Sequence, residues 1–127
     1  MSEIALSRDD DVTLCALADL ADPGSMVLSL RRIDDSPARV MVLRKGGKVF
    51  AYEDVCPHIP LPLEQLGGKV LDSDGRRIYC ANHGALFEVD TGLCVKGLCE
   101  GKSLTPFAVQ VRDGRVIHPA QKLPPGR

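Results

Sequence analysis

The chain of 127 residues is long enough for one domain with a hydrophobic core and too short for two. Apolar residues make up 44% and charged residues 26%, which is ordinary for a soluble globular domain and excludes a disordered class. The net charge of -1 and the aromatic content of 4% supply neither the basic surface nor the stacking side chains of a nucleic-acid-binding protein, so we expect no nucleic-acid partner.

The two ends of the chain bear on its location and its domain boundaries. Residues 1–11 are polar and acidic and lack the basic segment and apolar run of a secretory signal. No stretch approaches the roughly 18 apolar residues of a membrane span. We therefore expect a cytoplasmic protein with no membrane partner. Residues 119–127 are rich in proline and in polar or charged residues, so both ends are predicted to be flexible and residues 12–118 to form a single domain.

The middle of the chain is predicted to be all-β. Short apolar runs of strand length alternate with turn signals, and no segment keeps a period of 3.6 residues. Glycine-containing turns at residues 46–47, 90–92 and 113–114 predict hairpins, and one helical turn is expected within residues 18–24. The predicted strands, in chain order, are residues 12–17, 25–31, 39–43, 48–53, 77–80, 85–89, 93–96, 107–112 and 115–118.

Two short motifs combine cysteine with histidine. Five cysteines are an odd number, and a cytoplasmic chain keeps its thiols reduced, so metal binding explains them better than a disulfide framework. Cys56 and His58 form a C-x-H motif, and Cys80 and His83 form a C-x-x-H motif. Ligands this close along the chain can bind one small centre only where the backbone turns sharply. A proline inside the first motif and Gly84 after the second favour such turns. Each motif is predicted to form one loop tip.

The donor set permits two kinds of metal centre. Two thiolates and two imidazoles suit either a tetrahedral zinc ion or a mixed-ligand iron–sulfur centre. In zinc fingers each ligand pair has two cysteines or two histidines, whereas each loop here offers one of each. A centre with two irons explains this arrangement, because Cys56 and Cys80 can bind one iron while His58 and His83 bind the other. A zinc-stabilised interaction module without redox activity stays as the lesser alternative.

Together with the segments around them, the two motifs resemble the Rieske family of 2Fe-2S proteins. Residues 80–92 are similar to that family's second cluster loop and its following hairpin, residues 104–116 to its closing hairpin, and residues 48–58 to the entry into its first loop. The resemblance implies an antiparallel β-sandwich with a small cluster-binding subdomain, at about residues 54–100, formed by two loops. It also implies one 2Fe-2S cluster per chain, with the ligands Cys56, His58, Cys80 and His83.

The resemblance further implies a one-electron carrier rather than an enzyme. Similar low-potential bacterial ferredoxins pass electrons from a flavin-containing reductase to a ring-hydroxylating oxygenase, so a reductase and an oxygenase are the expected protein partners. Oxygenase subunits that share this domain need a second domain with mononuclear iron, for which 127 residues leave no room. The alternative is a small Rieske subunit of a larger reductase, such as a nitrite-reductase-type enzyme.

Several side chains outside the motifs carry separate expectations. Cys15, Cys94 and Cys99 are predicted to be buried small hydrophobes rather than a redox pair, and His118 is predicted to lie on the surface. High-potential members of the resembled family have a serine and a tyrosine, with hydroxyls bonded to sulfur, where this chain has Ala85 and Phe87. The resemblance therefore implies a reduction potential toward the low end of the family's range.

Overall fold

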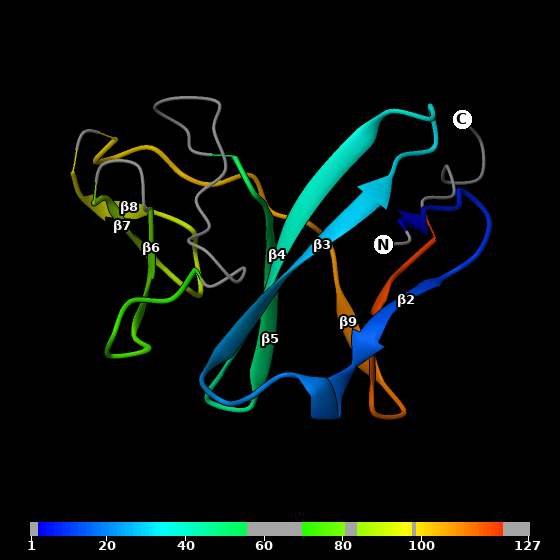
Figure 1. Ribbon diagram of the computed structural model, residues 1–127, viewed down its shortest axis with the longest axis horizontal. Helices are drawn as coiled ribbons and strands as arrows, with labels where there is room; N and C mark the ends of the chain where they lie inside the picture. Colours follow the sequence, from blue (N-terminus) through cyan, green and yellow to red (C-terminus); the bar gives the residue numbers. More distant parts are fainter. Residues whose placement is uncertain (1–2, 56–69, 81–83, 98, 121–127) are drawn as a thin grey trace, which may run out of the picture.

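The computed structural model describes residues 3–55, 70–80, 84–97 and 99–120 (Figure 1). This part of the chain contains ten β-strands and a single short 3-10 helix, Leu17–Asp19. No helix in these segments is long and apolar enough to cross a membrane. The strands form three sheets, and the all-β fold predicted from the sequence is confirmed.

The first two sheets make up a sandwich. In the four-stranded sheet, β3, β4 and β5 are successive antiparallel neighbours, and β1 pairs with β3 in parallel. In the three-stranded sheet, β10 lies between β2 and β9, antiparallel to both. The strands are β1 (Ile4–Ala5), β2 (Val12–Ala16), β3 (Gly24–Arg31), β4 (Pro37–Lys45), β5 (Lys48–Glu53), β9 (Gln110–Arg112) and β10 (Arg115–His118).

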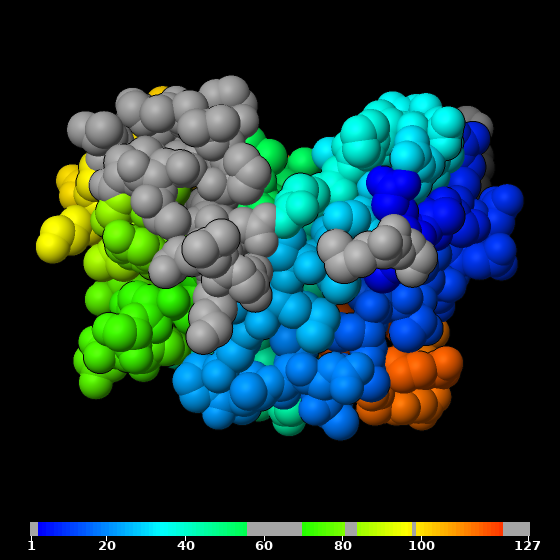
Figure 2. All heavy atoms as spheres, viewed as in Figure 1, coloured from blue at the N-terminus to red at the C-terminus, as the bar shows by residue number. Residues whose placement is uncertain are grey.

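The third sheet is smaller and forms one end of the molecule. Its strands are β6 (Arg77–Tyr79), β7 (Leu86–Glu88) and β8 (Cys94–Lys96), which run antiparallel in that order. In the space-filling view its green and yellow segments lie at the opposite end from the orange β9–β10 hairpin (Figure 2). The strands β3, β4 and β5 lie between these two ends.

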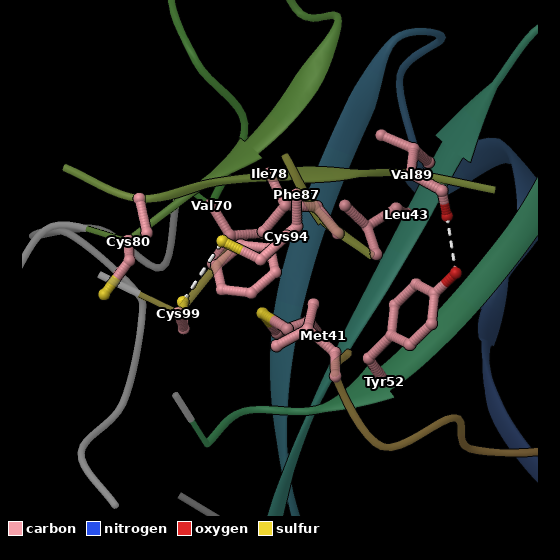
Figure 3. Packing of buried hydrophobic residues seen from close by; sticks show 12 residues of the cluster. Met41, Leu43, Tyr52, Val70, Ile78, Cys80, Phe87, Val89, Cys94 and Cys99 are labelled. Atoms are coloured by element: carbon pink, nitrogen blue, oxygen red, sulfur yellow. Dashed lines mark hydrogen bonds between the residues drawn. The ribbon is translucent and has the colours of Figure 1, made fainter. Parts of the chain in front are cut away.

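Strand β4 faces a hydrophobic core on each side. Successive side chains of a strand point to opposite faces of the sheet. Val40 and Val42 pack into the sandwich core, whereas Met41 and Leu43 pack into a second core against the small sheet (Figure 3). All four side chains are completely buried. The fully apolar run in the middle of β4 therefore joins the two parts of the fold.

Tyr52 ties β5 to the hairpin of the small sheet. Its hydroxyl donates a hydrogen bond of 2.7 Å to the carbonyl oxygen of Val89, beyond the end of β7 (Figure 3). Gly92, in the turn of the same hairpin, has a φ of +75°, and a Cβ placed on it would lie only 2.8 Å from Tyr52 Cε1. Glycine is therefore required here both by the backbone conformation and by the Tyr52 ring.

The predicted strands all occur, and those at residues 48–53 and 115–118 have the observed bounds. The 3-10 helix begins one residue before the predicted helical turn. Strand β1 falls within residues 1–11, where Ile4 and Ala5 pair with Leu30 and Arg31. The domain boundaries at residues 11 and 118 stay predictions.

The predicted strand at residues 107–112 is shorter than expected, because β9 begins at Gln110. The residues before it bond to β5 instead. Thr105 accepts a hydrogen bond from the Glu53 amide, and the Phe107 amide donates one to Ala51, each at 2.9 Å. This segment covers the edge of β5, a long-range pairing that the local sequence does not indicate.

Replacement of Tyr52 by phenylalanine is expected to lower the free energy of unfolding by about 1–3 kcal/mol, because the buried Val89 carbonyl loses its donor. Burial raises the pKa of the Tyr52 hydroxyl to about 12, with a smaller contribution from the Asp90 carboxylate. The pKa of tyrosine in the unfolded chain is about 10. Between pH 10 and 12 the hydroxyl is therefore protonated in the folded state and ionised in the unfolded state.

The stability that Tyr52 contributes should accordingly be complete below pH 10 and fall as the pH rises from about 10 toward 12. Denaturant unfolding followed by circular dichroism across this range measures the effect. The Tyr52→Phe protein should lack the extra slope, and Tyr79→Phe, at a half-buried residue of β6, serves as the matched control. Identical slopes for the wild type and Tyr52→Phe would contradict this account.

Candidate metal centre

The second cysteine–histidine motif begins where β6 ends. Cys80 follows β6 directly and is completely buried. Its amide donates a hydrogen bond to the Ala85 carbonyl and its carbonyl accepts one from the Gly84 amide, both at 2.9 Å. Gly84 has a φ of +74°, which is unfavourable for residues with a side chain. The sharp turn predicted at this glycine is present, and its hydrogen bonds bring Cys80 next to Gly84 and Ala85.

The structure places only part of the predicted ligand set. Cys80 is among the described residues, whereas Cys56, His58 and His83 lie outside them. The ligand set, including Cys80, therefore stays a prediction. In the described segments, no three side chains of histidine, cysteine, aspartate or glutamate are grouped closely enough to bind a metal ion.

Asp54 is a buried charged residue at the entry to the first motif. Its amide donates a hydrogen bond of 2.9 Å to the Arg39 carbonyl, and its Oδ2 lies 3.6 Å from Arg39 Nε. A buried carboxylate is costly unless it is paired, so this ion pair fixes the chain where it leaves β5. Asp54 is not predictable as a buried residue from the sequence, because an acidic residue after a strand usually marks a solvated turn. Its position two residues before Cys56 is the one available signal.

The loop after β8 packs against the turn that carries Cys80. Gly97 has a φ of +110°, and a Cβ placed on it would lie 2.9 Å from Ala85 Cα. Only glycine permits this approach. Cys94 and Cys99, at the two sides of this loop, are buried as predicted.

Cys15 and His118 belong to the sandwich rather than to the small sheet. Cys15 is partly buried, and this burial, with a smaller contribution from the Asp19 carboxylate, raises the pKa of its thiol. The prediction that His118 lies on the surface is wrong, since only 6% of it is exposed. Its ring stacks on Phe107 with centroids 4.2 Å apart, and its Nδ1 donates to the Ala108 carbonyl at 2.6 Å. The segment before β9 folds over His118, a long-range contact that the sequence does not show.

The described part of the centre suits an iron–sulfur cluster. Cys80 would provide a thiolate, the ligand type that iron–sulfur clusters prefer, from a turn held by two backbone hydrogen bonds. Its sulfur points away from the Phe87 ring and the Cys94–Cys99 pair (Figure 3).

Comparison with known proteins decides the family. The model of the Rieske [2Fe-2S] domain matches residues 8–112. The chain belongs to the Rieske [2Fe-2S] domain family. Its cofactor is accordingly a 2Fe-2S cluster, and the zinc alternative is set aside.

Two relatives of this Rieske protein are ferredoxins of nearly the same length. It is 32% identical over 109 residues to ferredoxin CarAc of Metapseudomonas resinovorans. The aligned segment covers 86% of this chain and 92% of the relative. It is also 32% identical over 104 residues to the ferredoxin component of biphenyl 2,3-dioxygenase from Rhodococcus jostii (strain RHA1), covering 82% and 87%. The match therefore extends over most of each ferredoxin.

Solved structures agree with this assignment. A chain in the complex of reduced oxygenase and oxidised ferredoxin in carbazole 1,9a-dioxygenase superposes with a TM-score of 0.65 at 29% identity, covering 90% of this Rieske protein and 95% of that chain. A small-subunit structure described as a putative nitrite reductase superposes with a TM-score of 0.59 at 24% identity, covering 85% and 96%. The second likeness shows a shared fold alone.

Two residues after the second motif lack side-chain hydroxyls, and this bears on the reduction potential of the cluster. Ala85 and Phe87 follow the second motif and are completely buried, and neither has a donor for sulfur. A hydrogen bond to sulfur stabilises the more negative reduced cluster. The midpoint is therefore expected in the lower part of the family's range of about -150 to +300 mV. Ala85→Ser and Phe87→Tyr should each raise it by on the order of tens of millivolts.

A redox titration near neutral pH tests this expectation. Matched controls are Ala51→Ser and Phe107→Tyr, since both residues lie in the sandwich and should leave the midpoint unchanged. A wild-type midpoint above about +150 mV would contradict the account. Unshifted midpoints in both test variants would show instead that solvent access, and not these hydroxyls, sets the potential.

Proposed function

We propose that this Rieske protein carries single electrons from a flavin-containing reductase to an oxygenase. The observation that carries the proposal is the match to two ferredoxins over 92% and 87% of their own lengths. One of these is the ferredoxin component of a dioxygenase, and a similar solved chain comes from an oxygenase–ferredoxin complex. The chain thus matches most of each ferredoxin, and we infer that it acts as an electron carrier and not as an enzyme.

The four proposed ligands would be shared equally between the two irons of the cluster. Cys56 and Cys80 would bind one iron, and His58 and His83 the other. When bound, the 2Fe-2S cluster supplies a reversible one-electron step. Imidazoles are neutral and thiolates are anionic, so this ligand set raises the reduction potential above that of four cysteines. The cytoplasmic location expected from the sequence stays a prediction.

The surrounding residues would keep the ligands in place as the charge changes. The hydrogen bonds between Cys80, Gly84 and Ala85 hold the second turn, and the packing of Gly97 on Ala85 supports it from the loop after β8. The ion pair of Arg39 with Asp54 holds the entry to the first motif. Fixed ligand positions favour a carrier, because one geometry has to serve both oxidation states.

The alternative of a small reductase subunit has weaker support. The similar nitrite-reductase small subunit is 24% identical, which bears on the fold only. A subunit of this kind would be isolated together with a large partner. A free carrier would meet its donor and its acceptor in separate, transient encounters.

Two measurements test the proposal. Dithionite titration of the purified protein should take up one electron per chain and produce the electron paramagnetic resonance signal of a reduced Rieske cluster. In an extract of the native source, that signal should elute with a free small protein. Cys80→Ser should lose the signal, whereas Cys15→Ser, at a partly buried residue of the sandwich, should keep it.

Either of two results would contradict the proposal. A colourless protein without the signal would remove the redox function altogether. A signal that always elutes with a large subunit at fixed stoichiometry would support the reductase alternative instead.

A further inference from the structure

Cys94 and Cys99 form a pair of thiols in the small sheet, separate from the two ligand motifs. Their sulfur atoms lie 3.2 Å apart, and the Cys99 thiol donates a hydrogen bond to Cys94 Sγ (Figure 3). The Cys94 thiol donates in turn to the Lys96 carbonyl at 3.3 Å. Cys15, by contrast, packs against the sandwich core. The sequence favoured buried small hydrophobes over a redox pair at these two positions, and both side chains are buried and in direct contact.

The backbone holds the two cysteines in this arrangement. The Cys94 amide donates to the Lys102 carbonyl at 2.8 Å, and the Gly101 amide donates to the Cys94 carbonyl at 3.1 Å. The Lys102 amide donates to the Cys99 carbonyl at 2.9 Å. These bonds hold the backbone on both sides of the pair, and both cysteines are buried. A disulfide has an S–S distance of about 2.05 Å, so the sulfurs need to approach by only about 1 Å.

We propose that Cys94 and Cys99 are a dithiol that peroxide-class oxidants convert to a disulfide within this loop. One thiol attacks the O–O bond of hydrogen peroxide, which yields a sulfenic acid and releases water. The other thiol then attacks that sulfur, forms the S–S bond and releases a second water. Two thiols are oxidised by two electrons in all, and the peroxide is reduced to two waters.

The surroundings of the dithiol determine how an oxidant reaches the thiols and which part of the structure the disulfide would affect. Cys94 is 1% exposed and Cys99 is completely buried, but Gly97, Glu100 and Gly101 in the same loop are exposed. Transient breaking of the described backbone bonds between Cys94 and residues 101–102 would admit a small oxidant. Gly97 packs on Ala85 in the turn that carries Cys80, so a bond across the loop would restrain the support of that turn.

Peptide mapping of the cluster-loaded protein tests the proposal. The protein is treated with stepwise additions of hydrogen peroxide while the visible spectrum of the cluster is followed. Each sample is then denatured with excess alkylating agent and digested with trypsin. Trypsin cleaves after Lys96, between the two cysteines, so a disulfide joins the peptides of residues 78–96 and 97–102.

The expected result is this joined pair of peptides before the cluster spectrum is lost, with two fewer alkylated thiols than the five cysteines provide. Dithiothreitol should separate the peptides. Because Cys80 shares the first peptide, Cys94→Ala has to abolish the link, while Cys15→Ala retains it. Recovery of both Cys94 and Cys99 in alkylated form from protein already bleached by peroxide would overturn the proposal. A link that persists in Cys94→Ala would also overturn it.

Discussion

The burial of β4 on both faces is the constraint on which the rest of the structure depends. Side chains alternate between the two faces of a strand. Val40 and Val42 therefore pack into the sandwich core, while Met41 and Leu43 pack into the core of the small sheet. Each such side chain contributes about 1.5–3 kcal/mol when it is fully buried. The small sheet is too short to build a stable core of its own. It uses one face of the larger sheet as the other half of its core.

The same packing also positions the described segments that precede the two ligand motifs. Strand β5 leads through Asp54 into the first motif, and its Tyr52 bonds to Val89 in the hairpin that follows the second. The second motif begins at Cys80, where β6 ends, and Ile78 of β6 packs in the same core as Met41. The segments that lead into the two motifs are therefore held by strands that share one core.

Much of this arrangement could be predicted from the sequence, because it depends on local signals. Apolar runs bounded by glycine turns located the strands, and Gly84 indicated the sharp turn after the second motif. The ligand pattern and the hairpins around it identified the family. What the sequence did not show depends on contacts between distant segments. Such contacts bury His118 and pair Asp54 with Arg39.

Mixed ligation by cysteine and histidine is the central claim about the metal centre. Pulsed electron paramagnetic resonance of the reduced protein, with all histidines labelled with ¹⁵N, tests it most directly. The account predicts couplings from two ¹⁵N nuclei bound to iron, assigned to His58 and His83. Because His118 is stacked on Phe107 in the sandwich, its replacement by asparagine should leave both couplings unchanged. A reduced cluster without strong nitrogen couplings would contradict the account.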